Sequence, residues 1–490
     1  MKREDLLSKI SDPSKVWDVV VIGGGATGLG VAVDAVTRGY SVALFEWEDF
    51  AKATSSRSTK LVHGGVRYLA QGDVSLVLEA LYERGLLQQN APHLVKNQSF
   101  LIPNYRYWDN FLYTVGLTIY DILAGRLSLG RSKYVSKKKT TSYLPTVRVD
   151  GLKGGVVYHD GQFDDSRLAV NLAQSCVENG GCPINRMKVT AMLHGSDGRA
   201  RGVKVQDLMN GQEYEVKAKA VINATGIFVD SIMEMDVPTH EHMVKPSQGV
   251  HLVLDKSFLQ SDYAIMIPKT DDGRVLFAVP WHDKVVVGTT DTLREHPELE
   301  PQALESEIEF ILNTAGRYLT RKPQRSDVLS VFAGLRPLAA PKKEGKSTKE
   351  ISRSHKIFVS ENKLITITGG KWTTYRRMAE DTVDKAIELN LLEKKACVTK
   401  KFRIHGYQLN PDLNNHLYIY GSDIQAIKTL MQSDPAMAEK LHPKYDYTVA
   451  EVVWAVREEM ALNVEDILAR RVRLLFLDAR VAAEVAPKVA

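Results

Sequence analysis

Three glycines that follow a buried strand constrain the fold of this chain more than any other feature. Residues 18–22 (Asp-Val-Val-Val-Ile) form an apolar run that is typical of a strand covered on both faces of a parallel sheet. Gly23, Gly25 and Gly28 come next, in the spacing Gly-x-Gly-x-x-Gly, and lead into a helix that Gly39 ends. The first glycine permits a tight turn, the second lets a pyrophosphate approach the backbone, and the third lets the helix pack close to the sheet. The pattern predicts a Rossmann-like βαβ unit that binds a dinucleotide.

The residues after the second strand of this unit narrow the choice of dinucleotide. Glu46 ends that predicted strand and is placed to accept hydrogen bonds from a ribose diol. Residues 54–68 are rich in glycine and hydroxyl groups and precede any new helix. His63, Arg67 and Tyr68 cluster at the end of this loop. Such a loop can wrap a long cofactor with side-chain and backbone donors, whereas a loosely held NAD seldom needs one.

Later segments predict more of this sheet and a second one. Residues 218–226 and 363–370 each form an apolar strand that ends in a glycine turn, as further strands of the layered sheet would. Residues 250–254, 274–279 and 284–288 are short and rich in β-formers, and a tight turn joins the last two. They predict an antiparallel sheet in a second domain.

The C-terminal part is predicted to be helical, with Asn463 and Asp466 approximating a capping box. The expected fold class is α/β (α+β overall), with a Rossmann-like dinucleotide-binding domain, an antiparallel substrate domain and a C-terminal helical domain. The predicted segments are 1–90, 150–235 and 325–392 for the first domain, 91–149 and 236–324 for the second, and 393–490 for the third. The helical pattern continues to Ala490 without a capping signal, so we expect a longer natural chain.

Composition excludes several classes of protein. The chain has 490 residues, 44% of them hydrophobic and 25% charged, which is typical of a globular protein of two or three domains. A net charge of +5 is too small to predict nucleic-acid binding but leaves room for a basic pocket. Three scattered cysteines without a Cys-x-x-Cys pair favour reduced thiols over a metal site. No apolar run reaches the roughly 18 residues of a membrane span, and residues 1–15 lack a signal-peptide core. We expect a protein that is soluble or lies on a membrane surface.

The motifs together resemble those of the FAD-dependent glycerol-3-phosphate dehydrogenases, in the D-amino-acid-oxidase-like flavoprotein superfamily. Beyond the glycine motif, the resemblance rests on residues 54–56 (Thr-Ser-Ser), 60–68 (Lys-Leu-Val-His-Gly-Gly-Val-Arg-Tyr), 223–226 (Asn-Ala-Thr-Gly), 279–281 (Val-Pro-Trp), 288–291 (Gly-Thr-Thr-Asp), 334–337 (Gly-Leu-Arg-Pro) and 369–376 (Gly-Gly-Lys-Trp-Thr-Thr-Tyr-Arg). Trp372 is a departure, because the family often has leucine there, and should alter packing more than chemistry. The resemblance covers residues 17 to about 385 and extends to the helical C-terminal part.

The resemblance implies non-covalently held FAD and oxidation of sn-glycerol 3-phosphate to dihydroxyacetone phosphate by hydride transfer to flavin N5. The implied cofactor-binding residues are Gly23, Gly25, Gly28, Glu46, Thr54, Ser55, Ser56, Lys60, His63, Gly64, Ala224, Gly226, Gly370, Lys371, Thr373 and Thr374.

The phosphate of such a substrate calls for fixed cations. Arginine binds phosphate better than a flexible lysine does, because its guanidinium is a planar fork. Arg67, Arg336 and Arg353 each stand in or beside a motif, although a lone arginine is more often a surface charge. Lys371 is a further candidate substrate contact. Tyr68 either hydrogen-bonds the phosphate or packs in the pocket floor.

Oxidation of the alcohol also requires a base for the hydroxyl proton. A histidine, with its pKa near neutrality, suits this role better than arginine does. The resemblance suggests two, and we favour His251 as the base and His63 as a flavin or substrate contact, with a purely structural role as the alternative for each. His251 shares one face of its predicted strand with Val253.

Lys371 is predicted to begin a helix after a glycine turn. A cation and the positive end of a helix near the N1–C2=O edge of the flavin would stabilise the charge of the reduced form. Thr373 and Thr374 could add donors there. We therefore expect His251, His63, Arg336 and Lys371 to be the catalytic residues.

The electron acceptor is predicted from the length of the segment between Arg336 and Arg353 and from the composition of residues 108–139. The glycerol-3-phosphate oxidases carry an extra segment between the arginines that correspond to Arg336 and Arg353, and this chain lacks it. That favours a quinone acceptor, and hence contact with the inner face of the cytoplasmic membrane. Residues 108–123 form an aromatic, sparsely charged helix and residues 131–139 are basic, which suits an anionic membrane. The alternative is a helix docked on the substrate domain.

Other functions stay open at this level. They are an oxygen-using glycerol-3-phosphate oxidase, a related oxidase of amines or hydroxy acids, and a flavin-binding protein without turnover. The sequence also leaves a homodimer open.

Overall fold

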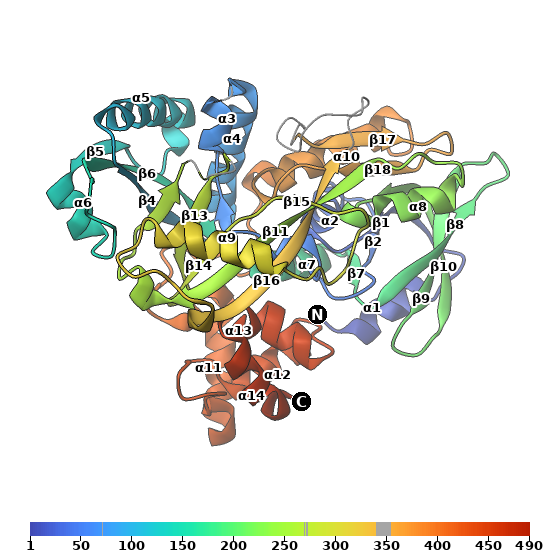
Figure 1. The fold of residues 1–490 in the computed structure, drawn as a ribbon. Helices are drawn as coiled ribbons and strands as arrows, with labels where there is room; N and C mark the ends of the chain where they lie inside the picture. The colour runs from blue at the N-terminus through green and yellow to red at the C-terminus, as the bar shows by residue number, and fades with distance from the viewer. Residues whose placement is uncertain (71, 269, 271–272, 340–353) are drawn as a thin grey trace.

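The structure is a computed structural model that describes residues 1–70, 72–268, 270, 273–339 and 354–490. Figure 1 shows two sheets beside each other, with the C-terminal helices below them. The first sheet and helix α8 lie on the right of this view, and the second sheet with helices α4 to α6 lies on the left. In this view the N-terminus lies above the C-terminal helices, and the C-terminus lies among them at the bottom of the molecule.

The glycine motif lies at the centre of the first sheet. Strand β1 (Val16–Ile22) pairs in parallel with β10 (Glu213–Asn223) on one side and with β2 (Val42–Phe45) on the other. Helix α2 (Ala26–Thr37) connects β1 to β2 and packs against α10 (Tyr375–Glu388). This arrangement confirms the predicted strand–helix–strand unit. The remaining strands of the sheet are β7 (Cys182–Ile184), β8 (Met187–His194), β9 (Ala200–Asp207), β17 (Lys356–Val359) and β18 (Ile365–Thr368).

The second sheet is largely antiparallel. Its strands run in the order β15 (Thr292–Leu293), β11 (Val244–Asp255), β14 (Lys284–Gly288), β13 (Leu276–Trp281), β12 (Ala264–Ile267), β4 (Val95–Asn104), β6 (Gly154–Phe163) and β3 (Leu61–Val62), with β16 (Val328–Ala339) on β11 and β5 (Lys133–Ser136) on β6. A turn at His282 and Asp283, both with positive φ, joins β13 to β14. The predicted antiparallel sheet is therefore confirmed. Side chains on alternate positions of β11 fall into two hydrophobic clusters, Val250 and Leu252 in one and Val253 in the other, which confirms the expected alternation.

Three strands depart from the predicted domain segments. Strands β3, β6 and β16 fall within segments 1–90, 150–235 and 325–392, which were assigned to the dinucleotide-binding domain, yet all three pair into the second sheet. The pairings of β3 with β6 and of β16 with β11 join strands that lie far apart in the chain, so local patterns carry no sign of them. The other domain boundaries stay a prediction.

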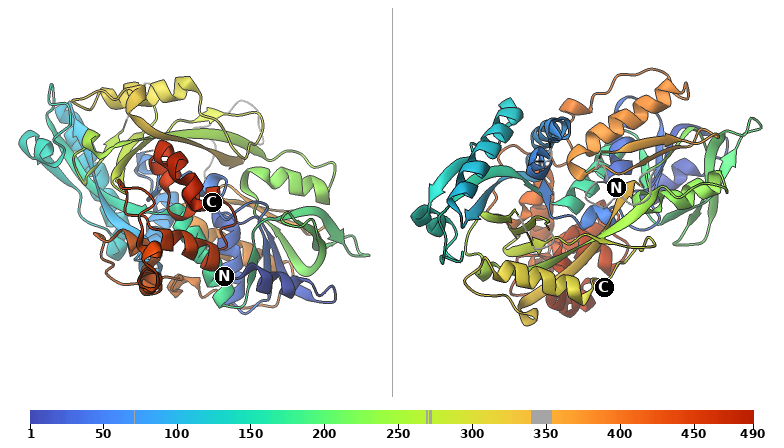
Figure 2. Two further views of the ribbon diagram at one scale, coloured as in Figure 1. Left: turned by 90° about the horizontal axis from the view of Figure 1, so that it is seen from below. Right: turned by 45° about the horizontal axis from the view of Figure 1, so that its top comes forward.

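Helices surround the two sheets and form the C-terminal part (Figure 2). The remaining α-helices are α1 (Arg3–Ile10), α3 (Val66–Ala70), α4 (Val74–Asn90), α5 (Tyr107–Ala124), α6 (Lys137–Tyr143), α7 (Asp165–Glu178), α8 (Val229–Asp236), α9 (Glu305–Gly316), α11 (Ile424–Ser433), α12 (Val449–Glu458), α13 (Leu474–Leu477) and α14 (Ala479–Val489). The predicted capping box is present, because Asp466 N donates to Asn463 Oδ1 and Asn463 N donates to Asp466 Oδ2.

The C-terminal part is joined to the rest by apolar packing and buried ion pairs. Phe332 of β16 lies edge-on to Phe476 of α13, with ring centres 4.9 Å apart. Asp49 accepts hydrogen bonds from both Arg470 and Arg471, and all three side chains are buried. The arginines hold the pKa of Asp49 well below its usual range, although burial alone would raise it. These charges therefore stay ionised and paired.

Candidate active site

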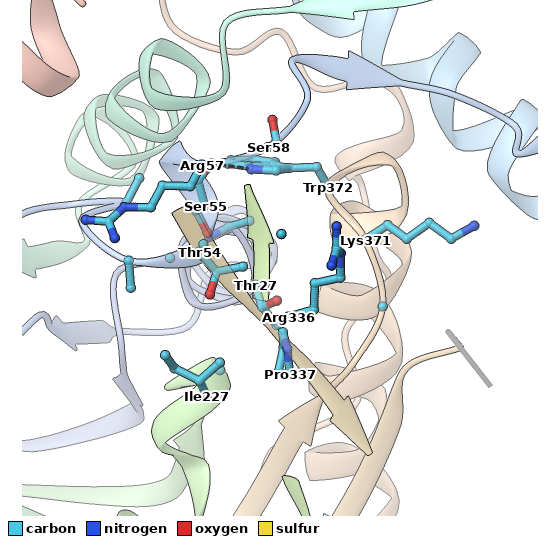
Figure 3. A pocket seen from close by; sticks show the side chains of 18 of the residues that line it. Thr27, Thr54, Ser55, Arg57, Ser58, Ile227, Arg336, Pro337, Lys371 and Trp372 are labelled. Atoms are coloured by element: carbon cyan, nitrogen blue, oxygen red, sulfur yellow. Dashed lines mark hydrogen bonds between the residues drawn. The ribbon is translucent and has the colours of Figure 1, made fainter. Parts of the chain in front are cut away.

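A cavity of about 510 Å³ is lined by residues of both sheets. The predicted site residues that line it are Gly23, Gly25, Glu46, Thr54, Ser55, His63, Tyr68, Ala224, Gly226, His251, Arg336, Gly370, Lys371 and Thr373. Figure 3 shows part of it, with Arg57 and Lys371 on opposite sides and Thr54, Ser55 and Arg336 between them. Residues from widely separated parts of the chain thus face one space of the size that ligands occupy.

The glycine motif forms a close-fitting turn at one part of this cavity. Gly23 has φ +105°, and a Cβ there would lie 2.8 Å from the carbonyl oxygen of Ala224. A Cβ on Gly28 would lie 1.9 Å from the carbonyl oxygen of Gly23. A Cβ on Gly25, the N-cap of α2, would meet only Ser55 Oγ within 4 Å, at 3.1 Å. The turn is thus tight on the protein side and open at Gly25, where a pyrophosphate can approach the helix N-terminus.

Glu46 directly follows β2 and is held by two backbone groups. Its Oε2 accepts from Gly24 N at 2.6 Å, and its Oε1 accepts from Glu48 N at 2.7 Å. Burial raises the pKa of Glu46 to about 7, against the lowering effect of these two hydrogen bonds. A carboxyl group held at this position can bind a ribose diol, as the sequence predicts.

The hydroxyl-rich loop is tied to the turn and to the second sheet. Ser55 Oγ accepts from Ala26 N, in the first turn of α2, at 2.9 Å. Thr54 Oγ1 donates to the carbonyl oxygen of Leu335 at 2.6 Å. Trp372 Nε1 donates to the carbonyl oxygen of Ser55 at 2.8 Å. Trp372 thus holds the loop against the Gly-Gly turn.

Some predicted cofactor residues do not line the cavity. They are Gly28, Ser56, Lys60, Gly64 and Thr374. Lys60 lies furthest from its predicted setting, because its side chain is fully buried and its Nζ lies 2.7 Å from Asp165 Oδ2 and 2.6 Å from the carbonyl oxygen of Ser56. Burial lowers the pKa of Lys60 to about 7. Lys60 is directed at the junction with the C-terminal part, where Arg473 also contacts Asp165.

Lys371 stands at the N-cap of a short 3₁₀ turn (Trp372–Thr374) that leads into α10. Its Nζ lies 4.3 Å from the centre of the Tyr68 ring, over the ring face. Thr373 Oγ1 accepts from His63 N at 3.2 Å, while Thr374 Oγ1 is turned back to the carbonyl oxygen of Lys371. The predicted helix start after the glycine turn is therefore present, with a cation and an aromatic ring beside it.

The two candidate histidines lie in different settings. His251 is buried on β11, its Nε2 lies 2.9 Å from Thr59 Oγ1, and its ring stacks on Phe332 with centres 4.9 Å apart. Burial, reinforced by the charges of Lys60 and Arg336, lowers the pKa of His251 well below its usual value. The imidazole is therefore neutral at physiological pH. His63 is less buried and lies at the junction between the hydroxyl-rich loop and Thr373.

Arg336 projects from β16 and is a quarter exposed. Its Nη2 donates to Thr289 Oγ1 and to the carbonyl oxygen of Thr290, each at 3.1 Å. Its Nη1 lies 3.5 Å from Asp291 Oδ1. The loop after β14 thus holds this guanidinium in one orientation at the cavity wall.

Sequence reasoning missed several residues of the cavity. Arg57, Arg274 and Asp160 line it, as do the apolar side chains of Phe100, Tyr158, Met266 and Phe277. The composition of the loop at 54–68 could have indicated Arg57, but nothing local distinguishes Arg274 at the start of a predicted strand. The side chain of Arg67 and the whole of Arg353 lie outside the described part of the structure.

Comparisons with known proteins show the family to which this chain belongs. A family model described as "FAD dependent oxidoreductase" matches residues 18–376, and one described as "C-terminal domain of alpha-glycerophosphate oxidase" matches residues 361–490. The chain is 40% identical to the mitochondrial glycerol-3-phosphate dehydrogenase of Schizosaccharomyces pombe, over 98% of this chain and 84% of that protein. It is 39% identical to the probable mitochondrial enzyme of that name in Caenorhabditis elegans, over 99% of this chain and 71% of that protein. The chain belongs to the FAD-dependent glycerol-3-phosphate dehydrogenase family.

Solved structures agree with this membership. The glycerol-3-phosphate dehydrogenase from Bacillus halodurans, solved with FAD, is 30% identical, with a TM-score of 0.79 over 99% of this chain and 90% of that one. The L-alpha-glycerophosphate oxidase from Mycoplasma pneumoniae is 17% identical, with a TM-score of 0.60 over 79% of this chain and 98% of that one, which shows a common fold. The predicted fold class is thereby confirmed.

FAD, the cofactor of this dehydrogenase family, fits the residues that are present. The tight turn at Gly23 and Gly28 leaves Gly25 open to a pyrophosphate, and Glu46 offers a carboxyl group to a ribose. Ser55 and the Gly369–Gly370 turn continue the same cavity wall towards Lys371. These residues would hold the cofactor.

Proposed function

We propose that this enzyme oxidises sn-glycerol 3-phosphate to dihydroxyacetone phosphate and passes the electrons to a quinone. The proposal rests above all on one observation. The cavity that begins at the dinucleotide-binding turn continues to a wall that carries Arg336, Lys371, His63 and His251. Cations for a phosphate and imidazoles for a proton thus line the same space as the groups that fit FAD.

The cations of this wall are assigned to substrate binding. Arg336 is suited to the phosphate, because Thr289, Thr290 and Asp291 orient its planar guanidinium at the cavity wall. Lys371 adds a second positive charge beside Tyr68. Their combined charge favours a dianionic substrate over an uncharged polyol.

The histidines are assigned to the hydroxyl proton. His251 is our proposed base: its imidazole is neutral, and Thr59 and Phe332 orient it, although its lowered pKa makes it a weaker base than an ordinary histidine. His63 contacts the substrate or the flavin. Bound FAD supplies the acceptor for the hydride that leaves C2 of the substrate. Loss of the hydroxyl proton and of the C2 hydride would leave the ketone product.

Anaerobic mixing tests the proposed substrate. Glycerol 3-phosphate should bleach the visible absorption of the bound flavin, whereas glycerol at the same concentration should leave it unchanged. A flavin that stays yellow with glycerol 3-phosphate would contradict the proposal. Oxygen uptake with stoichiometric peroxide during turnover in air would indicate the oxygen-using oxidase instead.

The proposed quinone acceptor is supported by an apolar face on helix α5. Apolar side chains that are 43–72% exposed recur at helical spacing along it: Trp108, Phe111, Leu112, Val115, Ile119 and Ile122. The neighbouring helix α4 exposes Val74, Leu78 and Tyr82. We call these nine residues the α4–α5 face. A face of this kind suits the boundary between lipid headgroups and acyl chains, where a quinone is accessible.

Charge next to this face favours an anionic lipid surface as its occupant. Arg131, Lys133 and Lys137–Lys139 are exposed and follow α5 in the chain, and α5 packs against β5 and β6. No helix among the described residues is long and apolar enough to cross a bilayer. We propose peripheral contact through the α4–α5 face. The inner face of the cytoplasmic membrane stays our prediction for its location.

Vesicle sedimentation tests the surface. The holoenzyme should sediment with vesicles that contain anionic phosphatidylserine, and Trp108→Ser combined with Phe111→Ser should reduce the bound fraction at least about tenfold, since both rings leave an interfacial site. Leu409→Ser is a matched control, because Leu409 is 63% exposed at a distance in the chain from this face. Equal binding by both variants would contradict the surface. A lower oligomeric state in the double variant would indicate a dimer interface.

A further inference from the structure

Helix α5 has an inner face that reaches the wall of the cavity. Tyr120 on this face is 1% exposed, and its hydroxyl donates to Asp160 Oδ2 of β6 at 2.8 Å. The same hydroxyl accepts from the backbone N of Gly64 at 2.7 Å. Burial and the charge of Asp160 raise the pKa of Tyr120 well above its usual value, so the hydroxyl keeps its proton and can donate.

Asp160 is itself fixed by a third element. Its Oδ1 accepts from Arg84 Nη1 of α4 at 2.7 Å, and both side chains are buried. Asp160 Oδ1 also accepts from Gly64 N at 3.4 Å, which is longer than the 2.7 Å between Gly64 N and the Tyr120 hydroxyl. One phenolic hydroxyl therefore connects α5, β6 and the loop at Gly64, while Arg84 neutralises the carboxylate at its far side.

Gly64 is the residue between two that line the cavity. His63 and Gly65 both face it, and His63 N donates a hydrogen bond to Thr373 Oγ1. The backbone at His63 is thus fastened at two points, by Thr373 from the Gly-Gly turn and by Tyr120 through Gly64. A Cβ on Gly64 would lie 2.5 Å from the Tyr120 hydroxyl, so only glycine allows this approach.

We propose that Tyr120 is a positioning residue for substrate oxidation, acting through the backbone of Gly64 on His63. The proposal rests on the proposed function in one respect, namely that His63 contacts the substrate or the flavin during oxidation of glycerol 3-phosphate. Under this proposal the buried side of α5, which carries Tyr120, supports the active site. The exposed side of the same helix forms part of the α4–α5 face.

The test uses Tyr120→Phe in the holoenzyme, which keeps the ring and removes the hydroxyl. Tyr107→Phe is the matched control, because Tyr107 stands at the start of the same helix and is 73% exposed. The limiting rate of anaerobic flavin bleaching by glycerol 3-phosphate should fall about tenfold in Tyr120→Phe, the effect of one lost buried hydrogen bond on a positioned group. The FAD content and the substrate dissociation constant should stay within about twofold of wild type, a split between rate and binding that general loosening would not produce.

Hydrogen–deuterium exchange supplies a readout that does not depend on activity. The backbone amides of residues 63–66 should exchange about tenfold faster in Tyr120→Phe than in wild type, because the Gly64 amide loses its nearer acceptor and keeps only the long contact to Asp160 Oδ1. Exchange elsewhere in the chain and in Tyr107→Phe should be unchanged. An unchanged exchange rate at Gly64 or an unchanged limiting rate would overturn the proposal, as would a parallel loss of FAD.

The two proposals fail in different ways. If glycerol 3-phosphate does not bleach wild type, the proposed function fails and the exchange experiment alone decides whether Tyr120 fixes this loop. If Tyr120→Phe does not fold, Asp160→Asn removes the charge that orients the phenol and should accelerate exchange at Gly64 in the same direction. Unchanged exchange in folded Asp160→Asn would then overturn the proposal.

Discussion

The two parts of the cavity are built in different ways. The dinucleotide-binding turn and Glu46 come from one continuous stretch, residues 16–46. Within this stretch the turn and the carboxylate are joined directly, because Gly24 N donates to Glu46 Oε2. The opposite wall is assembled from His63, His251, Arg336 and Lys371, which meet only because β3, β11, β16 and the start of α10 pack together. On the proposed function, a local motif binds the dinucleotide end of the cofactor, and tertiary structure brings the proposed catalytic groups together. Changes in the first part should act on FAD content, and changes in the second on catalysis at full FAD content.

The largest effect is expected at Gly28. Gly28→Ala places a Cβ 1.9 Å from the carbonyl oxygen of Gly23, a backbone atom that cannot yield without opening the turn. The purified variant should retain less than about a tenth of the wild-type FAD, since overpacking of this kind costs several kcal/mol. The flavin absorption per chain measures it.

Gly116→Ala is the matched control for that experiment. Gly116 lies in α5, and a Cβ there would meet nothing within 4 Å. The variant should keep its full FAD content and gain about 1 kcal/mol of stability from the better helix propensity of alanine. If Gly28→Ala also kept its full FAD content, FAD binding would not depend on the close packing of this turn.

The next effect is expected at His251. His251→Ala removes the proposed base and should slow anaerobic flavin reduction about 1000-fold, within the range of general base catalysis. The FAD content should stay near that of wild type, because His251 lies outside the dinucleotide-binding turn. Stopped-flow absorbance measures the rate, with His63→Ala as the comparison. A normal rate in His251→Ala and a slow one in His63→Ala would transfer the base role to His63.

Arg336→Ala should weaken substrate binding rather than cofactor binding. Loss of a charged, oriented phosphate donor should raise KM for glycerol 3-phosphate about 100-fold. Arg336→Lys should recover only part of this, because an ammonium lacks the planar fork. Arg106→Ala, at an exposed position before α5, serves as the control in the steady-state assay. An unchanged KM in Arg336→Ala would exclude this arginine from the phosphate site.

The smallest effect concerns the pH dependence of stability at Glu46. Burial raises the pKa of Glu46 to about 7 from its ordinary value of 4.5, so the folded protein holds a proton that the unfolded chain has released between these values. The stability of the flavin-free protein should therefore fall as pH rises from 5 to 8. Glu46→Gln should show a shallower decline, measured by urea unfolding across this range. Identical slopes would contradict the raised pKa of Glu46.

The sequence predicted most where neighbours in the chain decide the structure. The strand–helix–strand unit, Glu46 and the Gly-Gly turn before Lys371 all follow from local patterns and are present. The ion pair of the Lys60 side chain with Asp165, about 100 residues later, could not be seen in the motif at 60–68. Arg274 and the contact of Tyr120 with Gly64 depend on sheet pairing and helix packing, which no local pattern encodes.

A crystal structure of the enzyme with FAD and dihydroxyacetone phosphate tests the central claim most directly. The account predicts the dinucleotide across Gly25 and Glu46, and the phosphate of the ligand within hydrogen-bonding distance of Arg336 at the wall lined by the second sheet. A phosphate bound elsewhere, with Arg336 still turned to Thr289, Thr290 and Asp291, would contradict it.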